Sequence, residues 1–166
     1  ATEIKLYYPG EAFDAYLTII ETQLGNDRQR YAKTGSIPTS FKSMPATINS
    51  LSKASNSFTI TTSGAYDWLQ AYGVDRWTDN ALEYSISWSV YMDDTETKTF
   101  VIPSLPEAII ARYPVLSNAS FPEFSLVDIK DESSLDNYQD FIGMVWNTEV
   151  FAPDTEYFLR RKLFTE

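Results

Sequence analysis

Residues 82–92 read Leu-Glu-Tyr-Ser-Ile-Ser-Trp-Ser-Val-Tyr-Met, and this stretch determines the fold class. Every even-numbered position is apolar or aromatic, whereas the odd-numbered positions hold a glutamate, three serines and a tyrosine. Successive side chains of a β-strand point to opposite faces, so this alternation separates an apolar face from a mostly hydroxyl face. The stretch therefore predicts a half-buried β-strand.

A second strand is expected at residues 98–102, which are rich in threonine, phenylalanine, valine and isoleucine. The polar residues 93–96 between the two stretches resemble a turn, so the pair predicts an antiparallel hairpin. Pro103 follows and ends the second strand, because proline donates no hydrogen bond to a ladder.

Further strands are predicted from β-forming residues bounded by glycine, proline and serine, at residues 4–8, 57–62, 121–129 and 155–164. Residues 12–24 fit two alternatives. Their apolar residues follow a helical stripe, yet threonine, isoleucine and tyrosine favour a strand. The sequence Gly25-Asn26-Asp27 resembles a hairpin turn, so we favour strand–turn–strand over a helix here.

Two short helices are expected. Ser104 and Glu107 have capping-box spacing, and Pro106 suits a first turn, so the first helix is predicted from Ser104 to about Tyr113. The second begins near Ser134, with an amphipathic stripe at Tyr138, Phe141, Ile142 and Val145. Residues 33–56 are predicted to be a long irregular segment with one helical turn near 48–51.

Together these elements predict a mainly β domain: an antiparallel β-sandwich or open barrel with two short helices. The length of 166 residues fits a single domain over residues 1–166, and 43% hydrophobic residues supply a sizeable core. No stretch of about 18 apolar residues is present, so no transmembrane helix is expected.

Composition excludes several kinds of chemistry. The chain has no histidine and no cysteine, so it cannot build a Ser-His-Asp or Cys-His nucleophile, a Cys/His zinc site or a disulfide. The net charge of −10 and the scattered basic residues argue against binding nucleic acid. Acid–base chemistry would have to use aspartate, glutamate, lysine or tyrosine.

Residues 63–80 hold the best candidate for a ligand site, and they are predicted to form a loop, or a short helix plus a loop, between two strands. Flat aromatic faces stack on sugar rings, while carboxylates and arginine bind sugar hydroxyls. The candidate platforms are Trp68, Tyr72 and Trp77, and the candidate hydrogen-bonding partners are Asp67, Asp75 and Arg76. The alternative is that these aromatic side chains pack beneath the loop.

No cofactor is expected, and calcium is the one metal ion that stays open. Two acidic groups offer oxygen ligands: Asp93, Asp94 and Glu96 form one, and Asp75, Asp79, Asn80 and Glu83 form the other. Neither group has the spacing of an EF-hand loop, and acidic turns are commonly just solvated. A glycoside hydrolase would need two carboxylates across a cleft, and the sequence does not single out such a pair.

Parts of the chain resemble β-rich modules of bacterial surface lipoproteins of the kind found in Bacteroidota. The resemblance covers residues 57–145 and rests on five stretches: 57–60, 63–67, 87–91, 100–107 and 113–114. None of these stretches is a catalytic motif, and they define no named family. The resemblance implies an exported, cell-surface module without enzymatic activity.

The sequence thus favours a non-catalytic extracellular or cell-surface β-domain that binds a glycan or a protein partner. Two alternatives come from other classes of protein. One is a self-assembling structural subunit, such as a capsid, tail or surface-layer component. The other is a carboxylate-dependent glycoside hydrolase.

Overall fold

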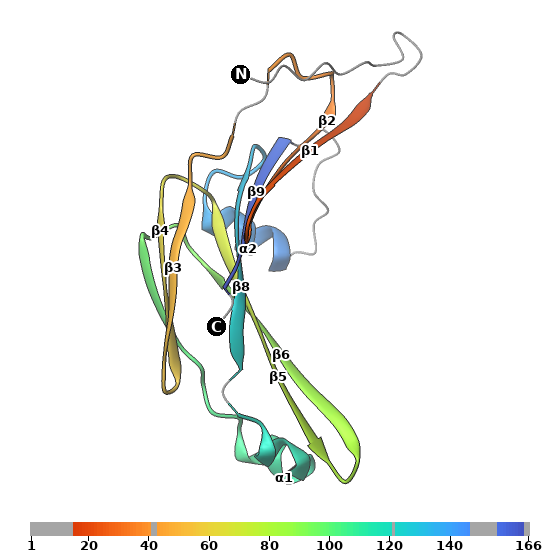
Figure 1. The fold of residues 1–166 in the computed structure, drawn as a ribbon, viewed down its shortest axis with the longest axis vertical. Coiled ribbons are helices and arrows are strands. Elements are labelled where there is room, and N and C mark those ends of the chain that lie inside the picture. Colours follow the sequence, from red (N-terminus) through yellow and green to blue (C-terminus); the bar gives the residue numbers. More distant parts are fainter. Residues whose placement is uncertain (1–14, 41–42, 121, 147–155, 165–166) are drawn as a thin grey trace.

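The computed structural model describes residues 15–40, 43–120, 122–146 and 156–164. In these residues nine strands form two antiparallel sheets, and neither sheet closes into a barrel (Figure 1). The predicted mainly β, sandwich-like fold is therefore confirmed. The strands are β1 (Tyr16–Leu24), β2 (Asp27–Gly35), β3 (Thr47–Ala54), β4 (Ser57–Ser63), β5 (Trp68–Asp79), β6 (Leu82–Met92), β7 (Thr97–Val101), β8 (Glu123–Glu132) and β9 (Glu156–Leu163).

The larger sheet has the strand order β1-β2-β9-β8-β5-β6. Residues 16–35 form the strand–turn–strand that the sequence favours, with Gly25 at a φ of 59° in the turn. The expected strands near 121–129 and 155–164 are present as β8 and β9. The strand expected at residues 4–8 lies outside the described residues.

The smaller sheet has the order β3-β4-β7, and β3 corrects one prediction. Residues 48–51 belong to a strand rather than a helical turn in an irregular segment. Hydrogen bonds between hydroxyl groups join the strands across the exposed face. The hydroxyl oxygens of Ser50 and Thr61 lie 2.6 Å apart, and those of Thr59 and Thr99 lie 2.8 Å apart. Such cross-strand pairs stabilise polar strands that an apolar alternation does not reveal.

β5 corrects a second prediction, because residues 68–79 form a long strand and not a loop. This strand pairs with β6 over residues 69–79 and with β8 over residues 68–74. It is covered on both faces near its start, so apolar and polar residues do not alternate along it.

The hairpin predicted between residues 82–92 and 98–102 does not form. β6 pairs with β5 through a turn at Asn80 and Ala81, both at positive φ, and β7 pairs with β4 in the other sheet. Residues 93–96 therefore cross from one sheet to the other. A two-residue turn with positive φ matches the twist of a hairpin, although Asn-Ala is a weaker sequence signal than Asn-Gly.

The helices are shorter than expected. Helix α1 (Glu107–Arg112) is preceded by Pro106 with no side-chain cap, so the predicted capping box does not form, and the 3₁₀ helix η2 (Pro114–Asn118) follows it. Helix α2 (Tyr138–Trp146) begins four residues later than Ser134. Its first turn is capped by Asn137, whose side-chain oxygen accepts hydrogen bonds from the backbone N–H groups of Gln139 and Asp140.

The core lies between the sheets, where aromatic rings meet above a glycine. The rings of Phe58 on β4 and Phe124 on β8 stack with centroids 4.2 Å apart. A Cβ atom placed on Gly73 of β5 would lie 2.9 Å from the Phe124 ring. Gly73 therefore lets Phe124 lie close against β5.

A polar contact also ties the two sheets together. Arg160 on β9 binds the carboxylate of Asp27 and donates a hydrogen bond of 2.8 Å to the carbonyl of Ala46, which precedes β3. The Lys162 ammonium donates a hydrogen bond of 2.8 Å to the Ile48 carbonyl. Both cations thus reach from the larger sheet to the backbone at the start of the smaller one.

We predict that Gly73→Ala destabilises the fold by about 1–3 kcal/mol, because the added methyl group overpacks the contact with Phe124. The matched control is Gly143→Ala in α2, where a Cβ atom would meet nothing within 4 Å. This control should be neutral or stabilising by up to about 1 kcal/mol, since alanine favours a helix. Guanidinium denaturation compares the two, and equal midpoints would contradict the prediction.

Candidate functional site

The six candidate ligand residues are spread along β5 instead of gathering in one loop. Trp68 and Trp77 are nine positions apart, which is about 30 Å along a strand. Nine is an odd number, so the two indoles also point to opposite faces of the sheet. Tyr72 and Arg76 share the face of Trp68, whereas Asp75 shares the face of Trp77. The structure therefore does not bring these residues together as a single platform.

Trp68 is covered by helix α2 and is only 7% exposed. Its ring stacks on Phe141 of α2 with centroids 4.5 Å apart and meets the edge of Tyr91 at 5.8 Å. The Lys130 ammonium lies 5.7 Å from the ring centroid. Trp68 thus anchors α2 to the larger sheet, which is the packing role that the sequence left open for it.

Asp67 and Asp75 already bind the chain's own backbone. Asp67 accepts a hydrogen bond of 2.6 Å from the Glu132 N–H. Asp75 accepts hydrogen bonds from the N–H and the hydroxyl of Ser120, at 2.6 and 3.0 Å. These carboxylates hold the end of β8 and the segment after η2 against β5. Of the six candidates, Tyr72 is 38% exposed, and Arg76 is exposed as well.

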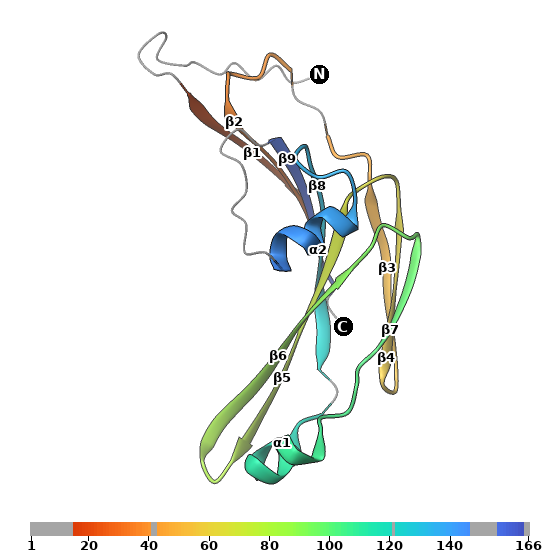
Figure 2. The ribbon, with the colours of Figure 1, turned by 180° about the vertical axis from the view of Figure 1, so that it is seen from behind.

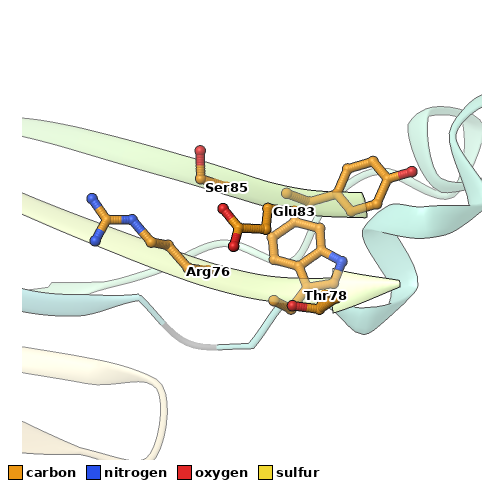
Figure 3. A pocket seen from close by; sticks show the side chains of 6 residues that line it. Arg76, Thr78, Glu83 and Ser85 are labelled. Carbon is orange, nitrogen blue, oxygen red and sulfur yellow. The ribbon is translucent and has the colours of Figure 1, made fainter. Parts of the chain in front are cut away.

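A hollow of about 350 Å³ lies at the end of the β5–β6 hairpin, and we call it the hairpin hollow (Figure 3). The β5–β6 register places Arg76 opposite Ser85 and Thr78 opposite Glu83, all on one face. Trp77 and Tyr84 point to the other face and stack on each other, with centroids 5.9 Å apart. The hairpin hollow therefore combines charged and hydroxyl groups with aromatic rings turned away from them.

A second cavity of about 320 Å³ lies beside β6, and we call it the α1 crevice. Five segments join β6 around it: the β3–β4 turn, residues 102–105, α1, η2, and the described residues 119, 120 and 122. Figures 1 and 2 show α1 at the hairpin end of β5 and β6. The lining residues are Ser55, Asn56, Ile86, Trp88, Ile102, Pro103, Ser104, Leu105, Ile110, Leu116, Ser117, Ala119, Ser120 and Pro122.

None of these described lining residues carries a charge, although the whole chain has a net charge of −10. The side chains of Ser55, Asn56 and Ser104 make no hydrogen bond to another described residue. They are therefore available to a ligand, whereas the Ser117 hydroxyl already binds the Pro114 carbonyl at 2.8 Å. The α1 crevice thus offers an apolar wall with a few neutral hydrogen-bonding groups, as ligand sites commonly do.

The alternation of residues 82–92 places Trp88 and Ile86 on the apolar face of their strand but does not predict the α1 crevice. One signal could have indicated it: the apolar face of residues 82–92 spans eleven residues, whereas the strands of the smaller sheet are shorter. β4 has seven residues and β7 has five, so the smaller sheet cannot cover the whole apolar face of β6. The uncovered end requires other apolar side chains, which α1 and η2 supply.

A group of carboxylates surrounds Asp67 at the opposite end of β5. Burial raises the pKa of Asp67 to about 6, opposed by the hydrogen bond from the Glu132 N–H and assisted by the charges of Asp131, Glu132 and Asp136. The Lys130 ammonium forms an ion pair with Glu132 at 2.7 Å. This region concentrates negative charge beneath the loop that follows β8.

Among the residues that the structure describes, no group of three or more acidic side chains is arranged to hold a metal ion. Asp93, in the first proposed calcium group, instead accepts a backbone hydrogen bond from Thr95 at 3.2 Å. Calcium binding stays an untested prediction. No helix in the described part of the chain has the length and apolar character needed to cross a membrane.

We predict that Asp67→Asn stabilises the protein at pH 7 by about 1 kcal/mol but not at pH 4. The folded state holds the Asp67 proton more tightly than the unfolded state, so the free energy of unfolding falls as pH rises from about 4 to the Asp67 pKa of about 6. Asparagine keeps the oxygen that accepts the Glu132 N–H bond but carries no charge. Thermal unfolding at both pH values measures the difference.

The control for this prediction is Glu83→Gln, which removes one negative charge from an exposed position at the other end of β5 and β6. If both variants shift stability equally at each pH, the effect reflects net charge rather than the surroundings of Asp67. If Asp67→Asn is destabilising at pH 7, the prediction is wrong.

Comparisons with protein-family models, with curated proteins and with solved structures find no match to this chain. The resemblance to β-rich modules of surface lipoproteins therefore stays a prediction.

Proposed function

We propose that this chain is a non-catalytic extracellular or cell-surface β-domain that binds a neutral glycan in the α1 crevice. The uncharged lining of the α1 crevice is the observation that carries the proposal. A charged ligand would have to leave water without meeting an opposite charge there, which costs several kcal/mol per ion. A neutral ligand does not incur this desolvation cost.

A saccharide suits the mixture of groups in the α1 crevice better than a purely apolar ligand does. Trp88 supplies a flat aromatic ring that can stack on a sugar, while Asn56, Ser55 and Ser104 supply neutral hydrogen-bonding groups. A purely apolar ligand would bury those polar groups without partners, which is unfavourable. The volume of about 320 Å³ lies at the lower end of the range for ligand sites, so it fits one or two sugar units.

Binding is favoured over glycoside hydrolysis because of the same lining. Hydrolysis uses two carboxylates on either side of the glycosidic bond. The described residues that line the α1 crevice include no aspartate or glutamate, and the nearby Asp75 carboxylate is already bonded to Ser120. A bound sugar would therefore meet hydrogen-bonding groups and an aromatic ring, without a general acid and a nucleophile.

We predict that neutral oligosaccharides shift the intrinsic tryptophan fluorescence, and that Trp88→Ala weakens their binding at least about tenfold. The matched control is Trp146→Ala, because Trp146 is 85% exposed at the end of α2. Calorimetry against neutral gluco-, manno- and galacto-oligosaccharides supplies the dissociation constants. Acidic oligosaccharides should bind more weakly, since the chain is negative and the described residues that line the α1 crevice include no cation.

Trp88 also packs against the core, so a second variant separates lost binding from lost folding. Ala119→Leu keeps the residue apolar and fills part of the α1 crevice, so it should also weaken binding. Unchanged affinity in both variants, or a preference for acidic oligosaccharides, would overturn the proposal.

A further inference from the structure

Among the described residues, strand β6 forms an edge of the larger sheet, with no strand on its outer side. Eleven consecutive residues pair with β5 without a shift of register, and no described strand pairs with the other side of β6 (Figures 1 and 2). From Leu82 to Val90 no backbone group bonds to a described residue outside the sheet ladder. At Tyr91 the carbonyl accepts a hydrogen bond of 3.2 Å from the Tyr138 hydroxyl.

This edge lacks the features that usually prevent strands from pairing between molecules. Such features include short length, proline, lysine, bulges and charges that point inward. β6 is eleven residues long and contains no proline, lysine, arginine or glycine. By contrast, β7 has five residues and an inward-pointing Lys98 that is buried, and β3 contains a register shift between Ile48 and Ser50.

The pattern of polar and apolar residues along β6 is symmetric about Ser87. In an antiparallel pair centred on Ser87, that residue meets its own copy, Ser85 meets Ser89, and Ile86 meets Trp88 of the second chain. Hydroxyl groups then face hydroxyl groups on one side of the sheet, and apolar groups face apolar groups on the other.

Charge also permits a second copy at this edge, despite the net charge of −10. The only charged residue in β6 is Glu83, which would lie opposite Tyr91 of the other copy. The two Glu83 side chains would be eight positions apart, or about 26 Å, which is well beyond the screening length in physiological salt. No like charges therefore oppose each other along the paired strands.

We propose that two copies of this chain associate through their β6 edges, as an antiparallel strand pair centred on Ser87. The interface is isologous, because the same strand of each copy supplies both halves. The larger sheets of the two copies join into one continuous sheet, and the serine faces of the two β6 strands lie on the same side of it.

Sedimentation equilibrium over a range of concentrations tests the association. We expect a monomer of 18.9 kDa in equilibrium with a species of twice that mass. Ser87→Lys should weaken the dimer at least tenfold, because two ammonium groups meet at the centre of the pair while Ser87 is exposed in the monomer. Thr97→Lys is the matched control, since it adds the same charge at an exposed position of the other sheet.

Disulfide trapping tests the register. The natural chain has no cysteine, so Ser87→Cys introduces a single thiol per chain. Directly opposed residues in an antiparallel pair have Cα atoms about 4.5–5.5 Å apart, within the range of a disulfide. We expect Ser87→Cys to form a covalent dimer on mild oxidation, whereas Ser85→Cys should not, because its two thiols lie four positions apart.

Three results would overturn the proposal. The first is a mass of 18.9 kDa for the unmodified protein at every concentration. The second is a Ser87→Lys dimer that is as stable as the Thr97→Lys dimer. Equal cross-linking of Ser85→Cys and Ser87→Cys would exclude the pairing centred on Ser87. Circular dichroism of each variant confirms that the monomer still folds.

Discussion

The stacking of Phe124 on Phe58, above Gly73, is the contact on which the arrangement of the two sheets depends. The ring centroids are 4.2 Å apart, and a Cβ atom on Gly73 would lie 2.9 Å from the Phe124 ring. A bulkier residue at this point of β5 would push β8 away from its partner or the smaller sheet away from the larger. This contact lies near the end of the sandwich, since β8 pairs with β5 only as far as Val74, one residue beyond Gly73.

Beyond that point β5 and β6 continue as a two-stranded ribbon, and their apolar face needs another cover. Helices α1 and η2 provide it, and the bond from Ser120 to Asp75 holds the following segment in place. The cover is incomplete and leaves the α1 crevice with an uncharged lining. Ion pairs such as Arg161 with Asp128, at 2.7 Å, lie on the opposite face of the larger sheet. The α1 crevice is therefore uncharged among its described lining residues, while charged pairs lie elsewhere on the larger sheet.

The sequence predicts those strands whose stability depends on an alternating apolar face, such as β6, and those that end at clear turns, such as β1 with Gly25. It does not predict β5, because a strand covered on both faces does not alternate between apolar and polar residues. Trp68 therefore reads as an aromatic residue in a loop, although in the structure it packs under α2. The wrong hairpin follows from that error, since β6 without β5 has only residues 98–102 to pair with. The α1 crevice depends on segments far apart in the chain, so local patterns do not reveal it.

A single alternating strand contributes to two different surfaces of this protein. The even-numbered residues of β6, among them Ile86 and Trp88, form a wall of the α1 crevice, while Ser85 and Ser87 leave the other face small and neutral. An antiparallel pair of β6 strands is related by a two-fold axis normal to the sheet, so it places both crevices on the same side of the joined sheet. Two weak sites on one side can bind a repeating polymer together, which raises avidity without any new contact within either site. Self-pairing and glycan binding are therefore compatible uses of the same strand.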